Sequence, residues 1–192
     1  MEKLFGRSKF KTAIFISGSG TNLKNLIIFS NKKKSPISVN LIISNKKKAK
    51  GLMYGKKYKI EQKVINFNNQ SMAEKKILKL LIKRKISFIC LAGFMKILSR
   101  DFISKFSGKI INIHPSLLPK YKGINTHKRA LQNNERFAGC TVHYVSSKLD
   151  SGKIIMQRKV GITKNESLTS LKKKVLKLEH LIYPKAIKKI LA

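Results

Sequence analysis

Acidic residues are scarce in this chain of 192 residues. Eight aspartates and glutamates stand against 43 lysines and arginines, and only Asp101 and Asp150 are aspartates. Chemistry that needs a carboxylate therefore has few candidates. The net charge of +35 could indicate nucleic-acid binding, because clustered cations bind phosphate. The lysines, however, are spread over almost every polar segment instead of forming one stripe with aromatic residues, which favours a solvated, self-repelling surface.

Cysteine and long apolar runs are also rare. The two cysteines, Cys90 and Cys140, lie within apolar stretches and lack metal-ligand spacing, so we expect buried thiols in a reducing cytoplasm and no bound metal. The apolar stretch near the N-terminus is about five residues long, shorter than the roughly 7 to 15 of a signal peptide or the about 20 of a membrane span. We therefore expect neither export nor a membrane partner.

Apolar runs rich in isoleucine and valine indicate buried strands at 12–17, 37–44 and 88–93. They do not alternate with polar residues, which is typical of parallel strands covered on both faces. Helical spacing lies between them, at 22–31 and 71–85. This order of strands and helices predicts an α/β fold with an open, mostly parallel twisted sheet and helices on both faces.

The pattern changes in the second half of the chain. Strands expected at 109–114, 140–145 and 153–162 have only short pieces between them, which predicts a mixed extension of the same sheet. From Ser167 onward, apolar residues fall along one stripe of a long amphipathic helix that would pack on the sheet. No repeat or low-complexity linker divides the chain, so we expect a single domain over 1–192.

The segment ISGSGTNLKNL places Gly18 and Gly20 between a strand and a helix whose first turn holds Thr21 and Asn22. Backbone N–H groups and the helix dipole make such a turn an anion site. No G-K-[ST] follows, and the third glycine and the ribose-binding acid of a dinucleotide fingerprint are missing. The segment therefore indicates a phosphate cradle, with a plain tight turn capped by Thr21 or Asn22 as the alternative.

The segment INIHPSLLPKYKG brings an amide and an imidazole to the end of a strand. Asn112 and His114 are two residues apart, so both side chains point to the same side. The carboxyl edge of an open sheet is the usual ligand crevice. A lone buried histidine is more often structural, but the amide beside it and the loop with two prolines favour a functional site.

Asp150 lies in a loop between two expected strands, followed by Gly152. Asp-x-Gly is commonly a simple turn. Because acids are few, Asp150 is nevertheless the candidate partner of His114, whose pKa it would raise and whose tautomer it would fix. We interpret His143, in the alternating segment TVHYV, as structural, and LAGFMKILS on its own as core.

Several segments together resemble a known family. In chain order they are FISGSGTNLKNLI, LAGFMKILS, INIHPSLLPKYKG, THKRAL, TVHYVSSKLDSGKII and EHLIYP, and they cover essentially the whole chain. They resemble the phosphoribosylglycinamide formyltransferases, a branch of the formyl-folate enzymes. The resemblance implies a Rossmann-like formyltransferase fold, with a phosphate-binding half at roughly 1–93 and a folate-binding and catalytic half at roughly 94–192.

The resemblance also implies a reaction. The amine of 5'-phosphoribosylglycinamide would take the formyl group of 10-formyltetrahydrofolate, the co-substrate, in purine (IMP) biosynthesis, without a metal. Its partners would be small molecules and not nucleic acid, in the cytoplasm, with the protein a monomer or homodimer. Two alternatives stay open: an enzyme like methionyl-tRNA formyltransferase, and a basic nucleic-acid-binding α/β module.

By the same resemblance, three residues would be catalytic. Asn112 would hydrogen-bond the developing oxyanion. His114 would donate a proton, and Asp150 would hold His114. The family also carries a cis peptide where this chain has Leu118–Pro119.

The resemblance assigns the binding residues as well. Gly20, Thr21 and Asn22 would form the phosphate-binding turn, and Glu179 would bind the ribose. The residues expected around the folate are Met95, Lys96, Ile97, Leu98, Asn112, Ser146, Ser147, Lys148 and Leu149. Gln70 stands where many members have an arginine that contacts the folate.

Overall fold

The computed structural model describes residues 8–191 of the chain. The strands are β1 (Phe10–Ile16), β2 (Ile37–Ser44), β3 (Glu61–Val64), β4 (Phe88–Leu91), β5 (Lys109–His114), β6 (Phe137–Tyr144) and β7 (Ile154–Gly161). The helices are α1 (Thr21–Ser30), α2 (Leu52–Lys57), α3 (Gln70–Lys83), α4 (Arg100–Lys105), α5 (Thr126–Gln132) and α6 (Leu168–Leu191).

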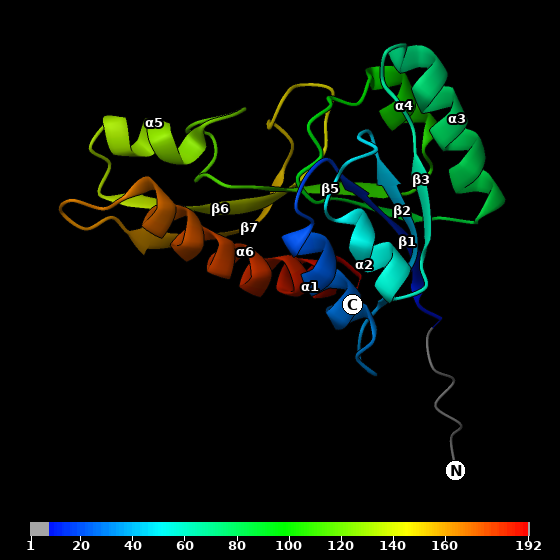
Figure 1. Cartoon of the computed structure of the whole chain (residues 1–192), viewed down its shortest axis with the longest axis horizontal. Helices are drawn as coiled ribbons and strands as arrows, with labels where there is room; N and C mark the ends of the chain where they lie inside the picture. Colours follow the sequence, from blue (N-terminus) through cyan, green and yellow to red (C-terminus); the bar gives the residue numbers. More distant parts are fainter. Residues whose placement is uncertain (1–7, 192) are drawn as a thin grey trace.

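All seven strands form one sheet in the order β3-β2-β1-β4-β5-β6-β7. The first five strands pair in parallel, whereas β6 and β7 are antiparallel to their neighbours. Figure 1 shows the two antiparallel strands extending from the parallel part of the sheet, and α6 running alongside them back to α1. The predicted open, mostly parallel sheet with a mixed extension is therefore confirmed.

The sheet separates two hydrophobic cores. In β1, Ile14 and Ile16 face the core that contains α1 and α6, whereas Ala13 and Phe15 face the core of α3 and α4. Both sets of side chains are fully buried. Because successive side chains of a strand point to opposite faces, a strand covered on both sides needs apolar residues at every position. The predicted helices on both faces, including the long C-terminal helix, are confirmed.

The sequence pattern missed β3, α2 and α4. β3 is an edge strand of four residues, EQKV, and none of them is buried. The two helices have only six residues each, too few for a clear apolar period. Across residues 8–191, none of the helices has the length and apolar character needed to cross a membrane.

Candidate active site

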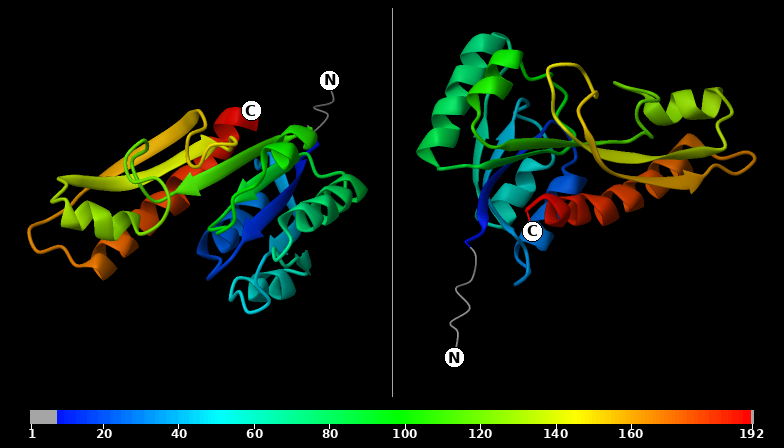
Figure 2. Two further views of the ribbon diagram at one scale, coloured as in Figure 1. Left: turned by 90° about the horizontal axis from the view of Figure 1, so that it is seen from above. Right: turned by 180° about the vertical axis from the view of Figure 1, so that it is seen from behind.

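A cavity of about 690 Å³ opens at the carboxyl ends of β4 and β5. Its walls come from the loops after these two strands, from the loop between β6 and β7, and from α1, α5 and α6. Figure 2 shows the β6–β7 loop, drawn in yellow, arching away from the sheet. A cavity of this size is typical of small-molecule sites.

His114 and Asp150 both line this cavity and contact each other. His114 Nδ1 lies 3.3 Å from Asp150 Oδ2, with side-chain exposures of 6% and 8%. The Gly123 N–H donates to the same carboxylate oxygen at 2.9 Å. The structure thus brings together two residues that the sequence proposed as partners.

The other ring nitrogen of His114 meets a backbone carbonyl. His114 Nε2 lies 2.9 Å from the Tyr121 carbonyl oxygen, so each ring nitrogen faces an acceptor. Tyr121 has φ 56°, and Asp150 has φ 45°. Residues other than glycine adopt positive φ infrequently, and strained backbone of this kind is enriched at functional sites. The backbone that surrounds His114 is therefore held in an uncommon conformation on both sides.

The pKa of His114 is lowered overall, because burial disfavours the charged ring. The Tyr121 carbonyl and Asp150 oppose that effect only in part. Asp150 therefore raises the pKa of His114, as predicted, but burial has the larger effect. For Asp150, burial favours a higher pKa, but the contact with His143 and the Gly123 N–H outweigh it and lower the pKa.

His143 is a site residue that the sequence analysis missed. It lies directly opposite Asn112 on the neighbouring antiparallel strand. Its Nε2 is 3.2 Å from Asn112 Nδ2 and 3.6 Å from Asp150 Oδ1. Its Nδ1 faces the Tyr144 carbonyl at 2.9 Å and donates to it. In the neutral ring Nε2 accepts from Asn112, whereas in the protonated ring Nε2–H donates toward Asp150. The structural interpretation of His143 is therefore incomplete, since the ring orients a predicted catalytic amide.

Asn22 and Glu179 meet at another part of the cavity wall. Asn22 Nδ2 donates to Glu179 Oε2 at 2.6 Å, although 157 residues separate them. Burial raises the pKa of Glu179 to about 7, against the hydrogen bond from Asn22. Among residues 8–191, the buried Asn22 Oδ1 has no hydrogen-bond partner. An orphaned buried acceptor in a cavity wall suits a ligand that brings a donor.

The predicted phosphate turn lies at the start of α1, next to Asn22. Gly20 has φ 73°, and a Cβ atom there would lie 2.5 Å from Gly51 Cα, so both conformation and packing require glycine. No side chain in the described part of the chain caps α1, which argues against the alternative of a capped turn. Neither Gly20 nor Thr21 lines the cavity itself.

Of the residues predicted for folate binding, Asn112 lines the cavity, and the others fall into three groups. Met95 and Ile97 line the cavity with exposures of 62% and 56%, and Lys96 and Leu149 line it beside them. Leu98 is buried in the core next to α3 and α4, but with Ser146 and Lys148 it lines a small adjoining hollow. Ser147 lines neither hollow among the described residues.

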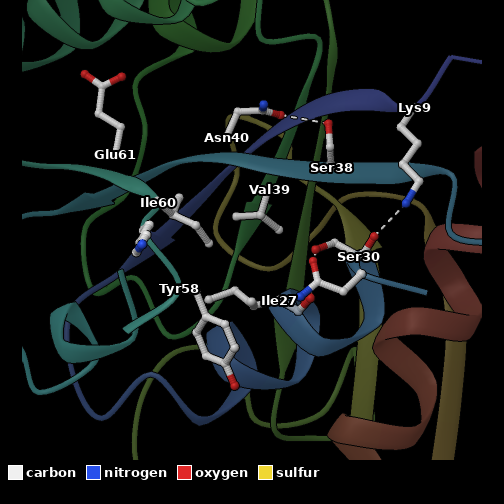
Figure 3. A pocket seen from close by; sticks show the side chains of 11 residues that line it. Lys9, Ile27, Ser30, Ser38, Val39, Asn40, Tyr58, Ile60 and Glu61 are labelled. Carbon is white, nitrogen blue, oxygen red and sulfur yellow. Dashed lines mark hydrogen bonds between the residues drawn. The ribbon is translucent and has the colours of Figure 1, made fainter. Parts of the chain in front are cut away.

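A second hollow, of about 610 Å³, lies on another part of the molecule. Figure 3 shows that it is lined by side chains of α1, β2 and the segment before β3, among them Ser38, Asn40 and Tyr58. None of the predicted site residues lines it. The predicted chemistry therefore belongs to the cavity at the carboxyl ends of the strands.

Comparison with known proteins identifies the family. A sequence profile described as "Formyl transferase" matches residues 10–187. The chain belongs to the formyl transferase family. The phosphoribosylglycinamide formyltransferase of Haemophilus influenzae is 41% identical over 181 residues, which cover 93% of this chain and 85% of that protein. The crystal structure of phosphoribosylglycinamide formyltransferase from Brucella melitensis is 38% identical, with a TM-score of 0.91 over 96% of this chain and 97% of that one.

Longer relatives of the family contain this unit as one part. The human trifunctional purine biosynthetic protein adenosine-3 is 39% identical over 186 residues, which are 95% of this chain but 18% of that protein. The chain thus spans less than a fifth of the trifunctional relative. Within the formyl transferase fold, the expected cis peptide is present at Leu118–Pro119.

Proposed function

We propose that the protein transfers the formyl group of 10-formyltetrahydrofolate to the amine of 5'-phosphoribosylglycinamide. The observation that carries the proposal is the buried pair of His114 and Asp150, with Asn112 beside it, in a cavity whose wall also holds Asn22 and Glu179. The named relatives of similar length support the same reaction.

The cavity fits the proposed co-substrate. Its mouth is apolar, with the exposed side chains of Met95, Ile97, Ile124 and Leu149 suited to a flat aromatic ring system. The folate supplies the formyl group. The ribonucleotide would lie toward Asn22 and Glu179, whose polar atoms suit ribose hydroxyls, with its phosphate at the N-terminus of α1.

Asn112 would stabilise the charge that develops on the transferred carbonyl oxygen. Its Nδ2 lies 3.2 Å from His143 Nε2 and 3.5 Å from Asp150 Oδ1. These contacts fix the plane of the amide before any substrate arrives. A donor fixed in advance stabilises a developing oxyanion without reorganisation at the moment of reaction.

His114 would act as the proton donor in the transfer. Its ring is held between Asp150 Oδ2 and the Tyr121 carbonyl oxygen. Because the pKa of His114 is lowered, the ring takes up a proton only with the help of these acceptors and releases it readily. Asp150, whose own pKa is lowered, would stay ionised and stabilise the charged ring.

The function is tested by following consumption of 10-formyltetrahydrofolate spectroscopically with and without 5'-phosphoribosylglycinamide. We expect consumption only when the ribonucleotide is present. Consumption that ignores the ribonucleotide would indicate hydrolysis, and formylation of methionyl-tRNA in a parallel reaction would indicate the other branch of the family. A cytoplasmic location and a monomeric or dimeric state stay predictions.

A further inference from the structure

The loop between β4 and α4, residues 92–99, forms one wall of the cavity and is anchored at its first end by β1. The Ser17 N–H donates to the Gly93 carbonyl at 3.0 Å, and the Met95 N–H donates to Ser17 Oγ at 2.7 Å. Phe94 packs edge-on against Phe15, with ring centroids 5.4 Å apart. This end is therefore tied both to the sheet and to the core.

The second end of the loop is anchored by Glu74 on α3, a carboxylate with 5% exposure. Its Oε1 accepts from the Ser99 N–H at 2.8 Å and from Gln70 Nε2 at 2.9 Å. Its Oε2 accepts from Ser99 Oγ. The Gln70 amide nitrogen also donates to the Ile97 carbonyl at 2.9 Å. Glu74 and Gln70 together thus fix the loop at Ile97 and Ser99.

The environment of Glu74 is unusual for a buried acid. Within residues 8–191 no lysine, arginine or histidine forms an ion pair with it, so its oxygens are satisfied by Gln70 and Ser99 alone. Burying a carboxylate without a cation is costly unless hydrogen bonds compensate. Ser99 already accepts from the Phe102 N–H as the N-cap of α4, so α4 does not need Glu74 for its cap. The acid instead connects α3 to the end of the cavity loop.

We propose that Glu74 is a positioning residue for formyl-folate binding. It holds the segment 95–98, which carries the exposed side chains of Met95 and Ile97 at the cavity mouth, in the shape that receives the folate. The assignment rests on the proposed function. Because Asn22 and Glu179 lie on other elements, Glu74 governs the folate side of the site and leaves the ribonucleotide side unaffected.

The test compares Glu74→Gln and Glu74→Ala with the wild type in the full-length protein. We expect Glu74→Ala to raise the KM for 10-formyltetrahydrofolate about tenfold, which corresponds to about 1.4 kcal/mol, and the nearly isosteric Glu74→Gln to raise it less. The KM for 5'-phosphoribosylglycinamide and the kcat should stay within about twofold. Amide hydrogen exchange of residues 93–99 should be faster in the ligand-free variants.

The matched control is Glu61→Gln. Glu61 pairs with Arg84, which lies just beyond the end of α3 that is farther from the cavity loop. Replacing Glu61 should therefore leave both KM values unchanged. Unchanged kinetics and exchange in both Glu74 variants would overturn the assignment, as would an equal rise of the two KM values. If the wild type does not use the ribonucleotide at all, the proposed function fails instead, a result that the Glu74 variants cannot imitate.

Discussion

His114 Nδ1 lies 3.3 Å from Asp150 Oδ2, and both side chains are almost fully buried. The contact depends on backbone geometry in both segments. β5 ends at His114, and the positive φ of Asp150 turns its side chain from the β6–β7 loop toward the end of that strand. Asp150 therefore has the position needed to stabilise a protonated His114, and variants can test whether it has this role.

Replacing Asp150 with asparagine should remove the charge that stabilises a protonated His114. We expect kcat to fall at least about a hundredfold, the typical contribution of general acid–base catalysis. Binding of both substrates and the fold should be retained, because asparagine has almost the same shape. Single-turnover kinetics, equilibrium binding and thermal unfolding of the same preparation measure these three properties.

Asp101, the other aspartate of the chain, provides the control. Its carboxylate is 64% exposed and pairs with Lys105 on α4, away from the cavity. Asp101→Asn should have wild-type kinetics. Near-normal turnover in Asp150→Asn would refute the catalytic assignment.

Much of the fold could be predicted from the sequence because the signals are local. The isoleucine-rich runs of β1, β2 and β4 are each buried on both faces, and that requirement appears directly in the composition. β3 carries no such signal, since it lies at the sheet edge and is polar.

The site was predictable only in part. Asn112 and His114 share a face because they are two residues apart on one strand. The proximity of His143 depends on the register between β5 and β6, which is a tertiary property that no local pattern in TVHYV encodes. The contact between Asn22 and Glu179 likewise joins α1 to α6. The family resemblance named both as substrate-binding residues but did not predict that they contact each other.

Replacing His143 with phenylalanine should loosen the Asn112 amide. The variant loses the acceptor 3.2 Å from Asn112 Nδ2 and the contact with Asp150. We expect kcat to fall roughly tenfold, because an amide that is no longer fixed in advance stabilises the developing oxyanion less well. Both KM values should change little. A kcat equal to that of the wild type would show that His143 is only structural.

The raised pKa of Glu179 predicts a specific pH dependence of stability. Burial raises this pKa from 4.5 in a model peptide to about 7, so the folded protein keeps a proton that the unfolded chain has released. The free energy of unfolding should therefore fall as pH rises from 4.5 to about 7, by about 2–3 kcal/mol from this group. Glu179→Gln should lose this part of the pH dependence, measured by urea denaturation at about pH 5 and about pH 8.

Glu166→Gln is the contrasting variant for that experiment. The hydrogen bond from Lys174 lowers the pKa of Glu166 to about 2, so Glu166 is ionised over the whole range tested. Its replacement should shift the free energy of unfolding equally at both pH values. A pH dependence in Glu179→Gln identical to that of the wild type would contradict the raised pKa.

The two glycines of the β1–α1 turn should respond differently to alanine. Gly20 has φ 73°, and a Cβ atom there would lie 2.5 Å from the Gly51 Cα, a backbone atom that cannot move aside cheaply. Gly20→Ala should therefore destabilise the protein by about 2–4 kcal/mol and raise the KM for the ribonucleotide, because the N–H groups at the start of α1 would shift. A Cβ atom at Gly18 would have nothing within 4 Å, so Gly18→Ala should change stability by less than about 0.5 kcal/mol. Urea denaturation and ribonucleotide kinetics on both variants check this, and equal behaviour of the two would show that the close approach to Gly51 does not determine the shape of the turn.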